Sequence, residues 1–427
     1  MEISAIHKLF LECSNLVIDT KKIIPNSMYL ALKGDRFDGN TFVQKALENG
    51  AKYAIIDNKE YFVDSRTVLV ENTLETLQKL ATFHRLFLNI PIIALTGSNG
   101  KTTTKELINC VLLKKFNTKA TFGNLNNHIG VPLTVLSFDS KTEIGIVEMG
   151  ANHQKEIEQL CEIARPDYGY ITNFGKAHLE GFGGVEGVIK GKSEMYIYLQ
   201  NNHKFAFVNL DDDLQNQKTQ HIERCTFSTT DTSADTFISG IEANPFVTIS
   251  WNQIVIQSKL IGLYNANNIN VAITIGQFFG ISNNDIKNGL ESYIPENNRS
   301  QIVVKGSNEV ILDAYNANPS SVKVAIENFV GLQKTNKIAI LGDMFELGSE
   351  SFEEHQMIVQ QVQNQSDFVC YFVGSDFNKA KISKPNMYFF ETFELFESHI
   401  NTQKPKNSFL LVKGSRGMAL ERILSLL

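Results

Sequence analysis

The chain has 427 residues, of which 43% are hydrophobic and 20% charged, and its formal net charge is −6. This composition is typical of a soluble globular protein of two to four domains, and the acidic balance argues against a nucleic-acid partner. The five cysteines are scattered without a Cys-x-x-Cys pair, which favours neither a disulfide framework nor a structural zinc site. No basic-then-apolar leader and no run of membrane-spanning length occur, so we expect a cytoplasmic protein without membrane insertion.

Residues 1–88 are predicted to form a small α/β domain. Apolar runs at 27–32, 53–56 and 68–70 indicate strands, and a helix with leucines at three-to-four spacing is expected from about residue 74, capped by Asn72 or Thr73. The segment 33–39 mixes glycine with both charges. Taken alone, it favours a polar turn or hairpin.

The next unit begins with the apolar run 92–95, which predicts a buried strand, and continues into Thr96-Gly97-Ser98-Asn99-Gly100-Lys101-Thr102-Thr103 and a helix. We call residues 96–103 the glycine loop. Strand, glycine loop and helix together indicate phosphate binding, because glycines let backbone N–H groups approach an anion and the helix N-terminus adds partial positive charge. Lys101 would reach the outer phosphates and Thr102 would offer its hydroxyl to magnesium. Only two residues separate the glycines where the general pattern has four, and the alternative is a glycine turn that leads into a helix.

Polar residues follow the next strands at the same predicted sheet edge. Glu148 ends the strand 144–147, the place of a magnesium-associated carboxylate in such domains. His178 follows the strand 168–173 and is either a ligand or a structural histidine. The segment 121–132, rich in asparagine and glycine, is either a loop shaped around a ligand or an ordinary surface turn.

The helix that starts near Val185 carries an inward-facing lysine. Lys192 falls on its apolar stripe, whereas Lys190 and Glu194 fall off it. A lysine here either snorkels to water or is a functional amine with a depressed pKa.

Residues 204–260 read as β-rich, with a polar loop expected at 226–235. Asn265 and Asn268 stand at the start of a helix, where they could cap it or hydrogen-bond a nucleotide base. Beyond this point, strands at 310–312, 338–341, 368–373 and 409–412 alternate with helices. They predict a second, mostly parallel α/β sheet with polar strand ends.

Several motifs together resemble those of the Mur ligases of bacterial cell-wall synthesis, over essentially the whole chain. They are the glycine loop, Gly123-Asn124-Leu125-Asn126-Asn127, Glu148-Met149-Gly150-Ala151-Asn152-His153-Gln154, Ala177-His178-Leu179-Glu180, Tyr315-Asn316-Ala317-Asn318-Pro319, Leu341-Gly342-Asp343-Met344 with Glu346-Leu347-Gly348, and Val412-Lys413-Gly414-Ser415-Arg416. The chain departs from the family pattern at Lys21 (usually arginine), at Tyr264 (usually histidine) and before Arg299, where the usual glycine is absent.

The resemblance implies three α/β domains: a UDP-sugar domain at 1–88, a central P-loop ATPase domain with a parallel sheet at 89–296, and a Rossmann-like domain at 297–427. It implies a monomer that closes over its substrates. Within the family, the motifs are most similar to members that join D-alanyl-D-alanine to UDP-N-acetylmuramoyl-tripeptide through an acyl phosphate, giving ADP, phosphate and the pentapeptide. The implied cofactors are ATP, two Mg²⁺ ions and carbon dioxide, the last bound as a carbamate on Lys192.

The resemblance also assigns site residues. Catalytic roles fall to Lys101, His178 and Lys192, and metal ligation to Thr102, Glu148, His178 and Lys192. Nucleotide contacts fall to Gly97, Ser98, Asn99, Gly100, Lys101, Thr102, Thr103, Asn265, Asn268, Arg299 and Asp313. Substrate contacts fall to Asp19, Thr20, Lys33, Gly34, Arg36, Asn124, Asn126, Asn127, Asn316 and Asn318.

Two rival functions are compatible with parts of the sequence. One is a related ligase that adds another residue, such as the enzyme that adds the third amino acid or folylpolyglutamate synthase. The motifs at 124–127 and 315–319 argue against both. The other is a nucleotide-binding regulator without ligation, which we would expect to lose Glu148, His178 or Lys192.

Overall fold

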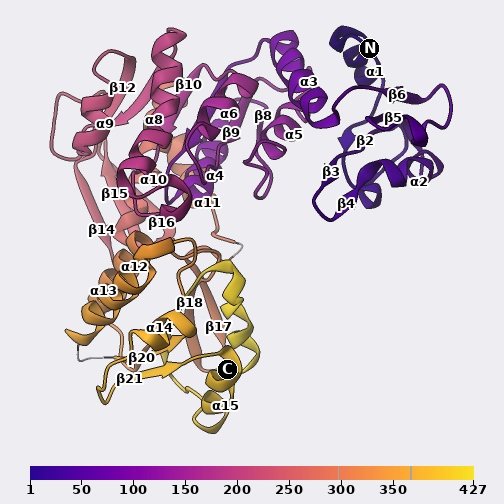
Figure 1. The fold of residues 1–427 in the computed structure, drawn as a ribbon. Coiled ribbons are helices and arrows are strands. Elements are labelled where there is room, and N and C mark those ends of the chain that lie inside the picture. Colours follow the sequence, from indigo (N-terminus) through magenta and orange to yellow (C-terminus); the bar gives the residue numbers. More distant parts are fainter. Residues whose placement is uncertain (297, 366–367) are drawn as a thin grey trace.

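The structure is a computed structural model that describes residues 1–296, 298–365 and 368–427; the predicted domain boundary at residue 297 lies outside the described residues. Three α/β bodies follow one another along the chain, each built on its own largely parallel sheet (Figure 1). The predicted α/β class with parallel sheets is thereby confirmed. Within the described ranges, no helix is long and apolar enough to cross a membrane.

The N-terminal body contains a four-stranded parallel sheet in the order β1-β2-β5-β6. Its strands are β1 (Leu16–Val17), β2 (Ser27–Leu30), β5 (Ala51–Ile56) and β6 (Thr67–Leu69), and its helices are α1 (Ile3–Leu11), α2 (Val43–Glu48) and α3 (Thr73–Leu88). The polar segment after β2 is a hairpin of β3 (Lys33–Gly34) and β4 (Phe37–Asp38). Asn72 caps α3 as predicted, since its side chain accepts a hydrogen bond from the Glu75 N–H at 2.9 Å.

The central body has a seven-stranded parallel sheet in the order β13-β12-β11-β10-β7-β9-β8 and a three-stranded antiparallel sheet, β14-β15-β16. Its strands are β7 (Ile92–Thr96), β8 (Thr118–Ala120), β9 (Ile144–Glu148), β10 (Tyr168–Ile171), β11 (Phe205–Asn209), β12 (Glu223–Ser228), β13 (Thr236–Phe237), β14 (Gly240–Ala243), β15 (Phe246–Trp251) and β16 (Ile254–Ile261). Its helices are α4 (Lys101–Leu112), α5 (Gly130–Leu136), α6 (Glu156–Ala164), α7 (Leu179–Phe182), α8 (Val185–Asn201), α9 (Asp213–Lys218), α10 (Ala266–Phe278) and α11 (Asn283–Ser292).

Two apolar cores lie on the two faces of the central sheet. Apolar side chains of α4, α10 and α11 pack with one, and those of α5, α6 and α8 with the other. Helix α3 packs on α1 of the first body and on α5 and α6 of the second, and so joins the two. The prediction of a loop at 226–235 is wrong for its first three residues, since Thr226 to Ser228 belong to β12. Phe227 is fully buried there, and its polar neighbours Thr226 and Ser228 pair with the adjacent strands.

The C-terminal body is a six-stranded sheet in the order β17-β18-β22-β19-β20-β21, parallel except for the β17–β18 pair. Its strands are β17 (Gln301–Lys305), β18 (Asn308–Asp313), β19 (Lys337–Gly342), β20 (Val369–Val373), β21 (Met387–Phe390) and β22 (Phe409–Lys413). Its helices are α12 (Pro319–Gly331), α13 (Ser351–Gln363), α14 (Ser375–Lys379) and α15 (Phe393–Thr402). In Figure 1 this body lies below the central one, and the N-terminal body stands off to the side.

Candidate functional site

A cavity of about 880 Å³ lies between the carboxyl edge of the central sheet and the C-terminal body, and residues of both line it. Most of the predicted nucleotide, metal and peptide contacts meet here. The predicted residues that line it are Ser98, Asn99, Gly100, Lys101, Thr102, Thr103, Asn124, Asn126, Asn127, Glu148, His178, Asn265, Asn268, Arg299, Asp313 and Asn316.

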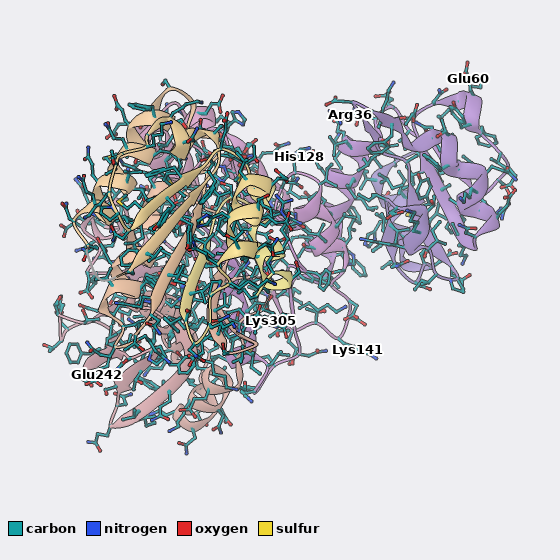
Figure 2. All side chains as sticks on the ribbon, turned by 90° about the horizontal axis from the view of Figure 1, so that it is seen from below. Arg36, Glu60, His128, Lys141, Glu242 and Lys305 are labelled. Atoms are coloured by element: carbon teal, nitrogen blue, oxygen red, sulfur yellow. The ribbon has the colours of Figure 1, made fainter. Side chains whose placement is uncertain are left out.

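The predicted UDP-sugar contacts do not join this cavity. Asp19, Thr20, Lys33, Gly34 and Arg36 belong to the N-terminal body. Figure 2 shows Arg36 on this separate lobe and His128, a cavity residue, at the edge of the central body that faces it. The remaining predicted residues, Gly97, Lys192 and Asn318, each contact a residue that lines the cavity. These partners are Lys101, Ala151 and Asn99, respectively.

The glycine loop is shaped by close backbone contacts. Gly97 (φ +141°) and Gly100 (φ +81°) adopt backbone conformations that favour glycine. A Cβ on Gly97 would lie 1.9 Å from the Thr172 hydroxyl oxygen. Thr172 and Asn173, at the end of β10, donate hydrogen bonds to the Asn99 carbonyl at 2.6 and 3.0 Å. The loop is thus held open at the N-terminus of α4, the arrangement that binds phosphate.

Lys101 is the first residue of α4 and folds back over the loop. Its Nζ donates to the Gly97 carbonyl at 2.7 Å. Burial lowers the pKa of the Lys101 ammonium, an effect that Glu148 opposes and Arg299 reinforces. An anion bound in the loop would accept a charge-assisted hydrogen bond from this ammonium, which belongs to the first turn of α4.

Glu148 ends β9 and is 2% exposed. Its Oε1 accepts a hydrogen bond from the Asn126 amide at 2.8 Å, while its buried Oε2 has no hydrogen-bond partner. A buried carboxylate oxygen without a partner is costly, and a divalent cation would satisfy it. Through this contact and the cavity lining, segment 121–132 lies at the candidate site, and its role as a loop shaped around a ligand stays a prediction.

His178 is paired across the domain boundary. Its Nδ1 contacts the Glu346 carboxylate of the C-terminal body. Burial lowers the pKa of His178, and the charge of Glu346 opposes that shift. Glu346 was not predicted as a site residue, although it follows a strand of the parallel sheet in a quoted motif. His178 is therefore a cavity residue with a partner that fixes its ring.

Lys192 lies on α8 and is 1% exposed, so the snorkelling interpretation is wrong. Its Nζ donates to the Ala151 carbonyl at 3.2 Å and lies 5.0 Å from the centre of the Phe182 ring. Burial lowers the pKa of Lys192 well below its usual range, and the charge of Lys101 adds to this shift. This position therefore favours a neutral amine.

Glu194, expected off the apolar stripe of α8, is also buried, with 7% exposure. Its carboxylate accepts hydrogen bonds from the backbone N–H groups of Lys155 and Glu158 at 2.6 and 3.0 Å. Glu194 thus accepts hydrogen bonds from N–H groups at the start of α6 that have no partner within that helix. Helical periodicity could not predict this contact, because it depends on a second helix.

Asn265 and Asn268 do not cap α10 through their side chains. The Asn265 amide donates to the Ile261 carbonyl at 2.8 Å, and the Asn268 amide donates to Asn265 Oδ1 at 2.8 Å. Asn268 Oδ1 accepts from Thr104 of α4 at 2.9 Å, so the pair is fixed against the glycine-loop helix. The base-binding alternative stays consistent with their place in the cavity wall.

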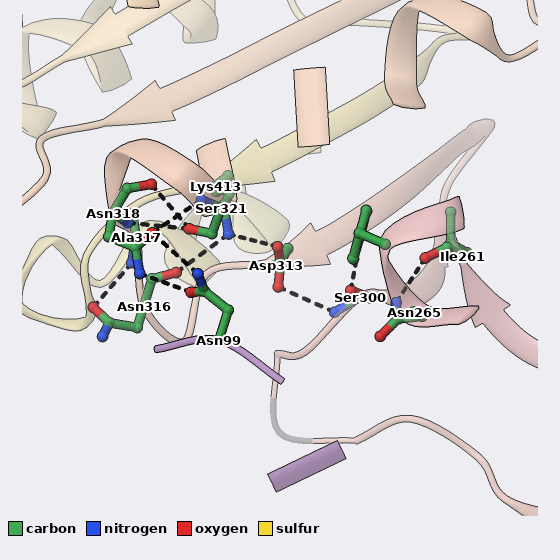
Figure 3. Close-up of polar contacts among 11 residues, drawn as sticks. Asn99, Ile261, Asn265, Ser300, Asp313, Asn316, Ala317, Asn318, Ser321 and Lys413 are labelled. Atoms are coloured by element: carbon green, nitrogen blue, oxygen red, sulfur yellow. Dashed lines mark hydrogen bonds and ion pairs between the residues drawn. The ribbon is translucent and has the colours of Figure 1, made fainter. Parts of the chain in front are cut away.

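The C-terminal body contributes further polar residues to the site, and Figure 3 draws Asp313, Asn318 and Lys413 among them. Asp313 accepts a hydrogen bond from Lys413 Nζ at 2.6 Å, and the Arg299 guanidinium lies 3.6 Å from the centre of the Tyr315 ring. The Asn318 amide donates to Asn99 Oδ1 of the glycine loop at 2.7 Å. Lys413 was missed as a site residue, although its position at the end of the buried strand β22 was a usable signal.

Comparisons with known proteins agree with this geometry. Family profiles match at residues 95–276 (Mur ligase middle domain), 298–416 (Mur ligase, glutamate ligase domain) and 12–85 (Mur ligase family, catalytic domain). The UDP-N-acetylmuramoyl-tripeptide–D-alanyl-D-alanine ligase of Bacillus subtilis is 33% identical over 95% of this chain and 91% of its own length. A crystal structure of MurF from Acinetobacter baumannii has a TM-score of 0.86 and 28% identity over 99% of this chain and 97% of that one. MurF ligase from Thermotoga maritima in complex with ADP has a TM-score of 0.84 and 27% identity over 98% and 97%. The chain therefore belongs to the Mur ligase family.

Proposed function

We propose that this protein is an ATP-dependent ligase that joins D-alanyl-D-alanine to UDP-N-acetylmuramoyl-tripeptide and yields ADP, phosphate and UDP-N-acetylmuramoyl-pentapeptide. The observation that carries the proposal is the meeting of Lys101, Glu148 and His178 in one cavity, with Lys192 buried behind it. The full-length similarity to ligases of this name supports the choice of substrates.

The reaction needs a carboxylate to be activated before an amine can attack it. In the proposed sequence the tripeptide carboxylate attacks the γ-phosphate of ATP, ADP leaves, and the amine of D-alanyl-D-alanine displaces phosphate from the acyl phosphate. Lys101 would stabilise the transferring phosphoryl group from the glycine loop. Asn265 and Asn268 would hold the adenine end, and Arg299 and Asp313 would approach the nucleotide from the C-terminal body.

The donor set fits magnesium. Among the described residues, no group of three or more His, Cys, Asp or Glu side chains is placed to hold a metal. Mg²⁺ commonly uses one or two carboxylates together with substrate phosphates. The unpartnered Glu148 Oε2 and Thr102, which lines the same cavity, fit this kind of coordination. When bound, magnesium would neutralise charge on the phosphates.

Lys192 and His178 would serve a second magnesium ion. We propose that the neutral Lys192 amine adds to carbon dioxide, forming an N–C bond and losing one proton to water, so that the lysine presents a carbamate. The lowered pKa of Lys192 supports this step, because only the neutral amine reacts. Glu346 would orient His178 toward the ion.

We also propose that the UDP end of the substrate is bound by the N-terminal body through Asp19, Thr20, Lys33, Gly34 and Arg36. The asparagines of segment 121–132, together with Asn316 and Asn318, would then face the peptide. A monomer would suffice, since one chain supplies the residues of the cavity wall. The five free cysteines are in keeping with a cytoplasmic location.

The test is phosphate release from ATP with UDP-N-acetylmuramoyl-tripeptide, with and without D-alanyl-D-alanine. We expect release that depends on both substrates and a pentapeptide product identified by mass. Release with glutamate or a third-position amino acid instead would identify a different ligase. No release with any acceptor would overturn the proposal.

A further inference from the structure

A short segment after β10 contacts both the glycine loop and the C-terminal body. We call residues 173–180 the bridging segment. On one side, the Asn173 amide donates to the Asn99 carbonyl at 3.0 Å, and the Gly175 carbonyl accepts a hydrogen bond from the Ser98 hydroxyl at 2.7 Å. The segment is therefore hydrogen-bonded directly to the loop.

On its other side the bridging segment binds two helices of the C-terminal body through Lys176. The Lys176 backbone N–H donates to the Ser320 hydroxyl on α12 at 2.9 Å. Its Nζ donates to Glu354 Oε1 on α13 at 2.5 Å. The Glu354 side chain is 5% exposed and that of Lys176 is 39% exposed. A carboxylate so far removed from water needs a partner, and here a different domain supplies one.

The packing around Gly175 leaves little freedom between these contacts. A Cβ at Gly175 would lie 3.0 Å from the Asn99 amide nitrogen and 3.2 Å from the Ser320 hydroxyl. The glycine loop, the bridging segment and α12 are thus in direct contact. His178 lies two residues beyond Lys176 and touches Glu346, so a shift of the segment would also move His178.

We propose that Lys176 and Glu354 are a positioning pair for the ligation, and that their ion pair holds the glycine loop and His178 in register with the C-terminal residues of the cavity. The inference rests on the proposed function. Neither side chain transfers a group or a proton; the pair acts through the residues it places. Because the pair joins two domains that each have their own sheet, its loss should change the position of the domains more than the folding of either.

The test compares Lys176→Met, Glu354→Gln and the double variant with Glu309→Gln as the control. Glu309 also forms an ion pair with a lysine, Lys334, at 2.8 Å, but both residues lie within the C-terminal body and the Glu309 side chain is 47% exposed. We expect each single substitution to lower kcat about tenfold, in the range of energetic coupling between sites. Lys176→Arg should restore most of the rate, since it keeps the charge.

The double variant shows whether the two substitutions lower kcat through one shared interaction or through two separate effects. If the two residues act as a pair, the double variant is no slower than the single ones. Wild-type kcat in either single variant, or multiplied losses in the double, would overturn the inference.

Small-angle X-ray scattering with ADP bound provides a readout independent of ligation. Both single variants should show a larger radius of gyration than the wild type and Glu309→Gln; an unchanged radius overturns the positioning role. If the wild-type protein itself does not ligate, the proposed function fails, and the scattering result still tests the ion pair.

Discussion

Replacing Gly97 by alanine should weaken nucleotide binding without unfolding the protein. The added Cβ would stand 1.9 Å from the Thr172 hydroxyl oxygen, on a backbone with φ +141°. Relief requires Thr172 to move, and its 2.6 Å hydrogen bond to the Asn99 carbonyl is then lost. Strain at such a backbone position costs about 1 to 3 kcal/mol, and a lost hydrogen bond adds about 1 kcal/mol. The binding-competent loop is therefore destabilised by roughly 2 to 4 kcal/mol, equivalent to about 30- to 700-fold in ADP affinity.

Isothermal titration calorimetry with ADP and magnesium measures this effect, with thermal unfolding as the check on folding. Gly331→Ala is the matched control, because its added Cβ has no packing neighbour within 4 Å beyond the adjoining backbone of its own helix. Combining Gly97→Ala with Thr172→Ala should recover part of the affinity by removing the clash, but not the backbone strain. An ADP affinity for Gly97→Ala within about threefold of wild type, less than 1 kcal/mol, would refute the reasoning.

Three further predictions concern buried ionisable groups. Lys192→Ala should abolish ligation, and added short carboxylates should restore part of it by replacing the carbamate; undiminished activity in the phosphate-release assay would exclude that role. Asp343→Ala should lower the free energy of unfolding by about 2 to 4 kcal/mol in urea titration, because the carboxylate accepts hydrogen bonds from two N–H groups at the start of α14; Asp343→Asn, which keeps one acceptor oxygen, should lose less. Burial and the neighbouring His84 lower the pKa of His7 from 6.5 to about 4. The unfolded chain therefore takes up this proton first, so His7 should contribute stability above about pH 6.5 that is lost as the pH falls toward 4. His7→Asn should flatten this part of the stability profile measured by thermal unfolding, and an unchanged profile would contradict the assignment.

Local features of the sequence predicted the glycine loop. An apolar run, two glycines and a helix beginning at Lys101 predicted the loop, because strand burial, backbone freedom and the helix N-terminus act within about a dozen residues. The contacts of Thr172 and Asn173 that hold the loop came only from the tertiary structure. Helical periodicity likewise indicated that Lys192 faces inward, since the 3.6-residue repeat sets which side of α8 packs on the core. The polar ends of parallel strands predicted that Glu148 and His178 would share an edge, and both line the cavity.

Only the tertiary structure decided which partners these residues have. The residues of the His178–Glu346, Lys176–Glu354 and Asn99–Asn318 contacts are 168, 178 and 219 positions apart. No short-range pattern specifies such pairs, because they depend on how the C-terminal body lies on the central one. The buried Glu194, whose partners come from another helix, was missed for the same reason. The sequence thus determined the chemistry available at each strand end, whereas domain packing decided which of these groups meet in the cavity.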